Sequence, residues 1–162
     1  MYAMPNRPNV QPDAQGQDTA LPTAKDLLKR LALAESQKAS ESARKQAELE
    51  AERTALIDRL RKPSGVSDEE AIRRASIVIR RAVDNGLSEV QVYRFPNKLC
   101  TDHGRAINVM EPGWEATLTG VPKEIYDLWV RHFRAKGYKI RFQVIDWPGG
   151  MPGDIGITLS WA

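Results

Sequence analysis

The sequence predicts an α+β protein, in which a small two-layer domain follows a polar tail and one long charged helix. Three observations lead to this fold class. Residues 23–61 contain neither Gly nor Pro and consist mainly of good helix formers. Residues 138–161 contain segments that alternate apolar and polar side chains with the period of strands. All aromatic residues except Tyr2 lie between Tyr93 and Trp161, so we expect the packed core in the C-terminal half.

Residues 1–22 are predicted to be a disordered tail, because four prolines interrupt a polar segment that cannot bury enough apolar surface. Either Met1 or Met4 is the expected start. The segment lacks the apolar stretch and the leading basic cluster of a secretory signal, and no apolar run is long enough to span a membrane. The single cysteine, Cys100, excludes an intrachain disulfide and fits a reducing compartment. We therefore expect a cytoplasmic protein without membrane association.

The long helix is predicted over residues 23–62, with Thr23 as its N-cap and a short linker at 63–66 that begins with Pro63. Its best heptad register places several polar residues in the seam, namely Glu35, Ser42, Gln46 and Arg53. Because a strong coiled coil has an unbroken apolar seam, the pattern indicates a solvated helix or a weak coiled coil. We expect residues 23–62 to serve self-association or the binding of a protein partner.

Residues 67–162 are predicted to form the α+β domain. A capping box at Ser67–Glu70 opens a helix that ends at Gly86. Pro122 lies in the first turn of a second helix, which ends at Gly137.

Three β-prone segments, 89–95, 138–144 and 155–161, supply the sheet, and the last two form a hairpin. The order α–β–α–β–β predicts a three-stranded mixed sheet with helices on one face. In it, the first two strands pair in parallel through a right-handed crossover and the hairpin adds an antiparallel strand. Residues 97–120 receive no assignment.

The other face of the sheet is predicted to be polar and open. It is expected to carry Lys139, Arg141 and Gln143. If Val90 and Val92 point into the core, Tyr93 and Phe95 lie on this face as well. On such a face, basic side chains neutralise the phosphates of single-stranded RNA and exposed aromatic rings stack on its bases. The element order also resembles the later elements of the C-terminal domain of bacterial translation initiation factor three and of Alba chromatin proteins. The alternative is that residues 97–120 or a second subunit covers this face.

An arginine stripe is predicted on the outer side of the first domain helix, made of Arg73, Arg74, Arg80 and Arg81. Residues seven apart share a helix face, so the four guanidinium groups form one patch that would suit phosphate. The alternative is an ordinary solvated face balanced by acidic residues of the same helix.

Cys100, Asp102 and His103 form the densest group of reactive side chains. A cysteine with a histidine indicates a nucleophile and its base, or two metal ligands. The chain has one Cys and two His, fewer than a zinc site needs, so we predict neither a metal nor a cofactor. The alternative is a loop around a buried thiol. His132 is expected to be a partly buried packing residue, and Asp146 and Asp154 are expected to cap the hairpin loop.

These observations favour a non-catalytic interaction protein, with the long helix as an arm and the domain as a recognition module. Single-stranded RNA binding on the open sheet face is the second hypothesis. An enzyme built on Cys100, Asp102 and His103 is the third. The net charge of +3 is small for a dedicated nucleic-acid-binding protein, which favours the first hypothesis.

Overall fold

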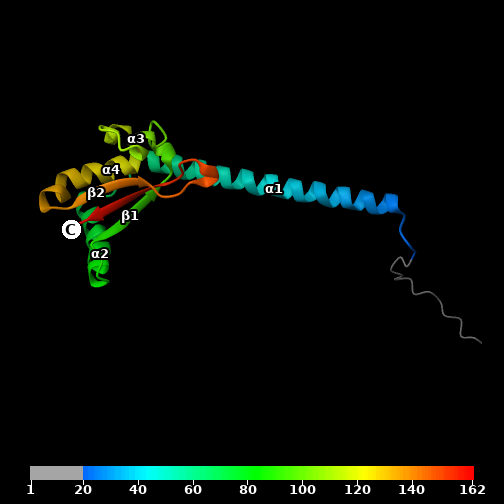
Figure 1. Ribbon diagram of the computed structural model, residues 1–162, viewed down its shortest axis with the longest axis horizontal. Helices are drawn as coiled ribbons and strands as arrows, with labels where there is room; N and C mark the ends of the chain where they lie inside the picture. The colour runs from blue at the N-terminus through cyan, green and yellow to red at the C-terminus, as the bar shows by residue number, and fades with distance from the viewer. Residues whose placement is uncertain (1–19) are drawn as a thin grey trace, which may run out of the picture. The chain divides into compact units, whose positions relative to one another are not determined.

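The computed structural model describes residues 20–162 (Figure 1). The helices are α1 (Ala24–Arg61), α2 (Asp68–Asp84), α3 (Arg105–Asn108) and α4 (Gly120–Leu128). The strands are β1 (Glu89–Phe95), β2 (Lys139–Val144) and β3 (Ile155–Ser160). The predicted α+β fold class is confirmed. The tail predicted over residues 1–22 lies almost wholly outside the described residues, and its disorder stays a prediction.

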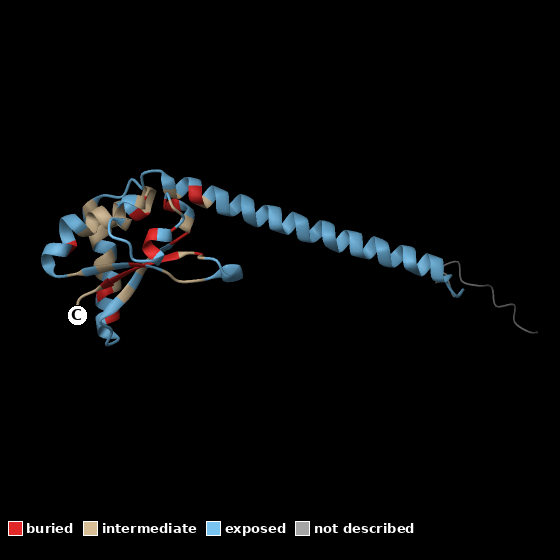
Figure 2. Cartoon of the chain, turned by 45° about the horizontal axis from the view of Figure 1, so that its top comes forward, coloured by how far each residue is buried: buried red, intermediate tan, exposed pale blue. Residues whose placement is uncertain are grey.

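Helix α1 begins where the sequence predicts it. The Thr23 hydroxyl oxygen accepts a hydrogen bond from the Asp26 backbone N–H at 3.1 Å, which is the geometry of an N-cap. All residues from Ala24 to Ala55 are exposed, and burial begins in the last turns, where Ile57 is 5% exposed (Figure 2). The chain divides into two units within this helix, one up to Glu48 and the other Leu49–Ala162, so the end of α1 belongs to the packed unit.

The sheet has the strand order β1-β3-β2, and both pairs of neighbours are antiparallel. The predicted hairpin of β2 and β3 is present. The predicted mixed sheet is wrong, because β3 lies between β1 and β2 and replaces their parallel pairing. The most apolar strand thereby takes the central position, where Ile155 and Ile157 are fully buried and Leu159 is nearly so.

Helices α2 and α4 pack on the same face of the sheet, and no helix or strand within residues 20–162 covers the other face, so the domain has two layers (Figure 1). Ile79 of α2 and Phe133, in a π-helical turn that continues α4, pack with Leu159. Residues 97–120 lie on the same side, where Leu99 and Ile107 join the core cluster. The alternative that residues 97–120 cover the polar face is therefore wrong.

An irregularity in β1 determines which of its side chains are buried. Gln91 pairs with Thr158 and Tyr93 pairs with Ile157, so Val92 is an extra residue, as in a β-bulge. The bulge shifts the alternation by one residue. Tyr93 and Phe95 consequently pack against the core, where Phe95 is 0% exposed. Their predicted position on the polar face is wrong for this reason.

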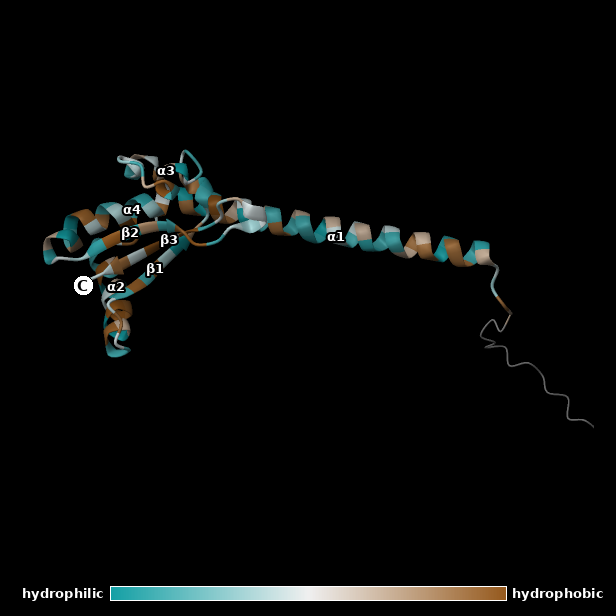
Figure 3. Ribbon diagram, viewed as in Figure 1, coloured by the Kyte–Doolittle hydropathy of each residue, from teal (hydrophilic) through white to brown (hydrophobic). Residues whose placement is uncertain are grey.

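The predicted alternation of burial holds in β2 but not in β3. Thr158 belongs to the polar face and yet is only 8% exposed. Gly156 is buried because Gln91 and Ile145 approach it from the flanking segments. The central strand is thus shielded by its neighbours on both faces, which the alternation of residue types alone does not predict. Figure 3 shows the apolar colour along this strand.

Two of the glycines with a positive φ determine how helices end or meet. Gly86 (φ +76°) ends α2 in a Schellman motif, in which the Leu87 N–H donates to the Ala82 carbonyl oxygen at 2.9 Å. Gly120 (φ +62°) is the first residue of α4, two residues before the predicted start. A Cβ at Gly120 would collide with the Leu60 carbonyl oxygen, so this glycine permits the end of α1 to contact α4.

Candidate functional site

The polar face of the sheet contains three cross-strand rows of side chains. The register sets Glu89, Ser160 and Lys139 in one row, and Gln91, Thr158 and Arg141 in the next. The third row is Arg94, Gly156 and Gln143. With Tyr93 and Phe95 on the opposite side, these rows contain no aromatic ring on which a nucleic-acid base would stack.

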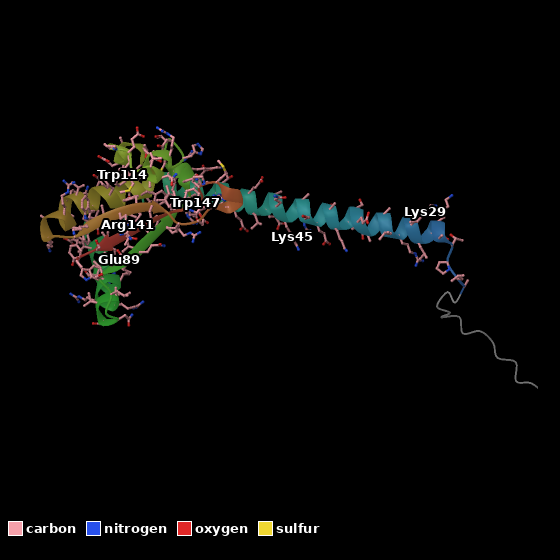
Figure 4. The ribbon with its side chains drawn as sticks, viewed as in Figure 1. Lys29, Lys45, Glu89, Trp114, Arg141 and Trp147 are labelled. Atoms are coloured by element: carbon pink, nitrogen blue, oxygen red, sulfur yellow. The ribbon has the colours of Figure 1, made fainter. Side chains whose placement is uncertain are left out.

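Arg141 is held by groups of the same face. Its guanidinium donates to both carboxylate oxygens of Glu89 at 3.2 and 3.4 Å, and its Nε donates to the Gln143 side-chain oxygen at 2.7 Å. Arg141 and Glu89 are labelled in Figure 4. The register explains this contact, because Glu89 and Arg141 lie in neighbouring rows on either side of β3. Arg141 therefore has a carboxylate partner, Glu89, on its own face of the protein.

Arg94 is bound in the same way at the other end of the face. It donates to Asp154 at 2.8 Å and to Asp146 at 3.0 Å. The hydrogen bond that Arg94 donates to Asp154 raises the pKa of Arg94, with a further contribution from the Asp154 charge. Asp146 also accepts from the Asp154 backbone N–H across the hairpin, which confirms the expected turn-capping role of Asp146. The two carboxylates serve structure and are occupied by this guanidinium.

The predicted arginine stripe is divided into two pairs. Glu70 accepts hydrogen bonds from Arg73 at 2.6 Å and from Arg74 at 3.0 Å, and these bonds lower the pKa of Glu70. Arg80 and Arg81 are exposed, and no carboxylate among residues 20–162 forms an ion pair with either. The capping box is half formed, since Ser67 accepts from the Glu70 N–H while the Glu70 carboxylate binds the arginines instead.

Cys100, Asp102 and His103 do not converge. Cys100 is 1% exposed, and burial raises the pKa of its thiol to about 11, so the thiol is neutral at physiological pH. The Asp102 carboxylate accepts from the Gly104 and Ala106 N–H groups at 3.0 and 2.8 Å and thereby caps α3. His103 is exposed, with φ 58°. Its backbone N–H donates to the Cys100 carbonyl oxygen at 3.2 Å, but no hydrogen bond within residues 20–162 joins its imidazole to the Cys100 thiol.

A cleft of about 410 Å³ lies beside this loop. Arg61, Lys98 and His103 line it together with Cys100, Thr101 and Thr119. Arg61 donates to the Lys98 carbonyl oxygen at 3.4 Å, which links the end of α1 to the loop after β1. Among residues 20–162, no group of three His, Cys, Asp or Glu side chains is placed to hold a metal ion.

Sequence reasoning missed a cluster around Asp68. His132 is exposed and its Nε2 lies 2.8 Å from an Asp68 carboxylate oxygen, so its expected role as a partly buried packing residue is wrong. Arg131 donates to the same carboxylate at 3.0 Å. Hydrogen bonds from Arg131, and then from His132, lower the pKa of Asp68. Only the fold brings these residues together, since Asp68 starts α2 and the other two lie in the turn after α4.

A groove of about 320 Å³ runs beside the last turns of α1. Leu49, Leu56 and Pro96 form its apolar part, and Glu52, Arg53 and Asp154 form its polar rim. Leu49 is 64% exposed. The sequence offers no signal for this groove, because Pro96 and Asp154 follow and precede strands that are distant in the chain from α1.

Further leucines of α1 are exposed along its first turns. Leu27, Leu28, Leu31 and Leu33 are 50–65% exposed. Figure 3 shows the apolar colour gathered near this end of α1. None of the helices in residues 20–162 combines the length and apolar content that a membrane crossing needs.

Comparison with protein-family models, with curated proteins and with solved structures finds no match to this chain. The resemblance of its element order to two groups of nucleic-acid-binding proteins is thus not accompanied by a detectable similarity. The candidate sites rest on the geometry of this chain alone.

Proposed function

We propose that this protein is a non-catalytic interaction protein in which α1 associates with a second copy and the α+β domain is a recognition module. The observation that carries the proposal is the exposure of α1 from Ala24 to Ala55. A solitary helix gains little stability in water from its residue preferences, and most helices are stabilised by packing of an apolar face. The exposed leucines of α1 supply such a face.

The leucine face of α1 is formed by Leu27, Leu31, Leu49 and Leu56. Leu49 lies 18 residues after Leu31, which is five full helical turns, so helical periodicity assigns the two residues to one face. Leu27 and Leu56 are offset from them by four and seven residues, which keeps them on the same side. Burial of each exposed leucine stabilises association by about 1.5–3 kcal/mol when complete.

The domain offers little support for a catalytic role. The neutral Cys100 thiol and the Asp102 carboxylate have structural partners, and the carboxylates of Asp146 and Asp154 are bound to Arg94. An enzyme requires a nucleophile or a base that faces substrate in a reactive protonation state.

Nucleic-acid binding on the polar sheet face is the second candidate. Lys139 and Arg141 are exposed on it, which favours contact with phosphate. The pairing of Arg141 with Glu89 and the absence of exposed rings on the rows of that face weigh against it. The same residues serve equally well as a polar surface for a protein partner.

Sedimentation equilibrium on the full chain over a hundredfold concentration range tests the proposal. We expect a reversible dimer that is weakened at least tenfold by Leu31→Glu, because a charge would enter the leucine face. Leu33→Glu is the matched control, since Leu33 is similarly exposed but points to the opposite side of the helix. A monomer at every concentration, or equal effects of the two substitutions, would reject the proposal.

A further inference from the structure

We infer that two copies pair through α1 in antiparallel orientation, so that the first turns of one α1 occupy the groove beside Leu49, Leu56 and Pro96 of the other. This inference rests on the proposed self-association and adds its orientation, its register and its docking site. The occupant is a second copy of the segment around Leu27, Leu28 and Leu31.

The exposed stretch of α1 sets the register. It runs from Ala24 to Ala55, and Ser40 lies at its middle. When two antiparallel helices are aligned with Ser40 opposite Ser40, Ala24 of one helix lies opposite Leu56 of the other. The whole exposed stretch of each helix is then paired. Leu56 lines the groove and is the first residue of α1 that is partly buried. In this register the first turn of the second copy's α1 therefore lies beside the start of the domain surface.

The charge of α1 reverses along this stretch. Residues 24–38 contain four Lys or Arg against two Asp or Glu, giving +2. Residues 41–52 contain two Lys or Arg against four Glu, giving −2. Antiparallel pairing places the basic segment of each helix along the acidic segment of the other, twice in the symmetric dimer. In parallel pairing in register, each segment would face its own like charge.

Individual positions agree with this arrangement. Residues at equal distances on opposite sides of Ser40 face each other, which pairs Leu31 with Leu49 and Glu35 with Lys45. In the parallel alternative, Glu35 and Lys45 would each face an identical residue. Of the polar seam residues that make a parallel coiled coil weak, Glu35 thereby gains an opposite charge in the antiparallel pair.

The groove has the chemistry that suits this occupant. Leu49, Leu56 and Pro96 present apolar surface, and carboxylates of Glu52 and Asp154 lie on the rim. The segment proposed to enter it carries leucines flanked by three cations, Lys25, Lys29 and Arg30. Asp154 is already bound by Arg94 at 2.8 Å and lies 3.9 Å from Arg53, whereas Glu52 forms no ion pair within residues 20–162 and is the rim carboxylate that can accept a cation of the second copy.

Pulsed dipolar electron spin resonance on singly labelled full-length chains tests the orientation. Cys100 is buried and neutral, so a thiol-reactive spin label modifies an introduced cysteine; the unsubstituted chain is the labelling control. Labels at Ser40→Cys are expected to lie close together, within about 25 Å. Labels at Lys29→Cys are expected to be separated by about 33 Å along the helix axis, from eleven residues on each side of Ser40.

Each outcome of this measurement has one meaning. Short distances at both positions would show parallel helices and overturn the inference while keeping self-association. A long distance at Ser40 would overturn the register. The absence of any dipolar signal at concentrations where the chain should be dimeric would reject self-association itself, and with it the proposed function.

Charge reversal provides a second test that does not need labels. Glu35→Lys is expected to weaken the dimer roughly tenfold, because it replaces two attractions to Lys45 by two repulsions. Glu35→Lys combined with Lys45→Glu is expected to restore the affinity to within about threefold. Asp58→Lys makes the same change of charge at an exposed position of α1 beyond the stretch that pairs, and is the control. An unchanged dissociation constant for Glu35→Lys would contradict the antiparallel register.

Discussion

Single residues decide which groups of the domain are available at its surface. The extra residue Val92 turns Tyr93 and Phe95 into the core and leaves Arg94 on the polar face, where Asp146 and Asp154 bind it. Several other arginines, among them Arg73, Arg131 and Arg141, likewise form ion pairs with carboxylates. Exposed pairs of this kind contribute little stability, but they remove charge that a phosphate ligand would need.

Phe95→Ala tests the position of the ring. We expect a loss of about 3–5 kcal/mol in the free energy of unfolding, because the substitution empties a fully buried site. Equilibrium unfolding in urea measures this loss. Gln91→Ala, on the polar face of the same strand, is the control and is expected to cost under about 1 kcal/mol. Similar small losses for both would show that Phe95 does not belong to the core.

Asp68→Asn tests the cluster with Arg131 and His132. Because the folded state lowers the pKa of Asp68, its ionised form stabilises the fold at pH values above the ordinary value of 3.8. That contribution is lost as the pH falls through the lower folded value. We expect the variant to be less stable than the natural chain at pH 6 and to approach it in stability as the pH falls below the ordinary value of 3.8.

Urea unfolding of both chains across this pH range provides the measurement. Asp58→Asn, at an exposed position of α1, is the control for the loss of one carboxylate. A stability difference that stayed constant from pH 6 to pH 2 would mean that the ionisation of Asp68 is not coupled to folding.

At the scale of elements, the contact of α1 with α4 joins the arm to the domain. Ile57 and Leu60 of α1 pack on the core cluster, and Gly120 admits the α1 backbone at the start of α4. The Ser64 hydroxyl donates to Glu124 of α4 at 2.6 Å, which fixes the turn after α1 on the same helix. The last turns of α1 are thus part of the domain.

Gly120→Ala is expected to destabilise the domain by about 2–4 kcal/mol, because a Cβ meets the Leu60 backbone at a positive φ. Gly113→Ala is the matched control. Gly113 also has a positive φ, but a Cβ there contacts nothing within 4 Å, so about 1 kcal/mol is expected. Thermal unfolding of the two variants compares them, and equal losses would show that α1 does not approach α4 at this point.

At the scale of the whole molecule, the proposals concern two surfaces, the leucine face of α1 and the polar sheet face. The interaction hypothesis predicts no salt-dependent binding of single-stranded RNA on the polar sheet face at physiological ionic strength, since Arg94 and Arg141 of that face are already paired with carboxylates. Fluorescence anisotropy with a labelled oligonucleotide measures this. Binding that weakens steeply with salt and is lost in Lys139→Glu/Arg141→Glu would instead support the nucleic-acid alternative.

The local structural elements of this protein can be predicted from its sequence. The caps at Thr23 and Ser67, the Schellman glycine Gly86 and the hairpin of β2 and β3 depend on residues close together in the chain, so composition and periodicity are enough to predict them. The α+β class follows from the order of these elements.

The tertiary structure alone decided the position of β3 between β1 and β2, the bulge at Val92, the contact of His132 with Asp68 and the groove beside Leu49. Each brings together segments distant in the chain, and each depends on which of several arrangements buries the most apolar surface while leaving polar groups bonded. Residue patterns state what a segment prefers, whereas the choice of neighbour is a property of the whole packed domain.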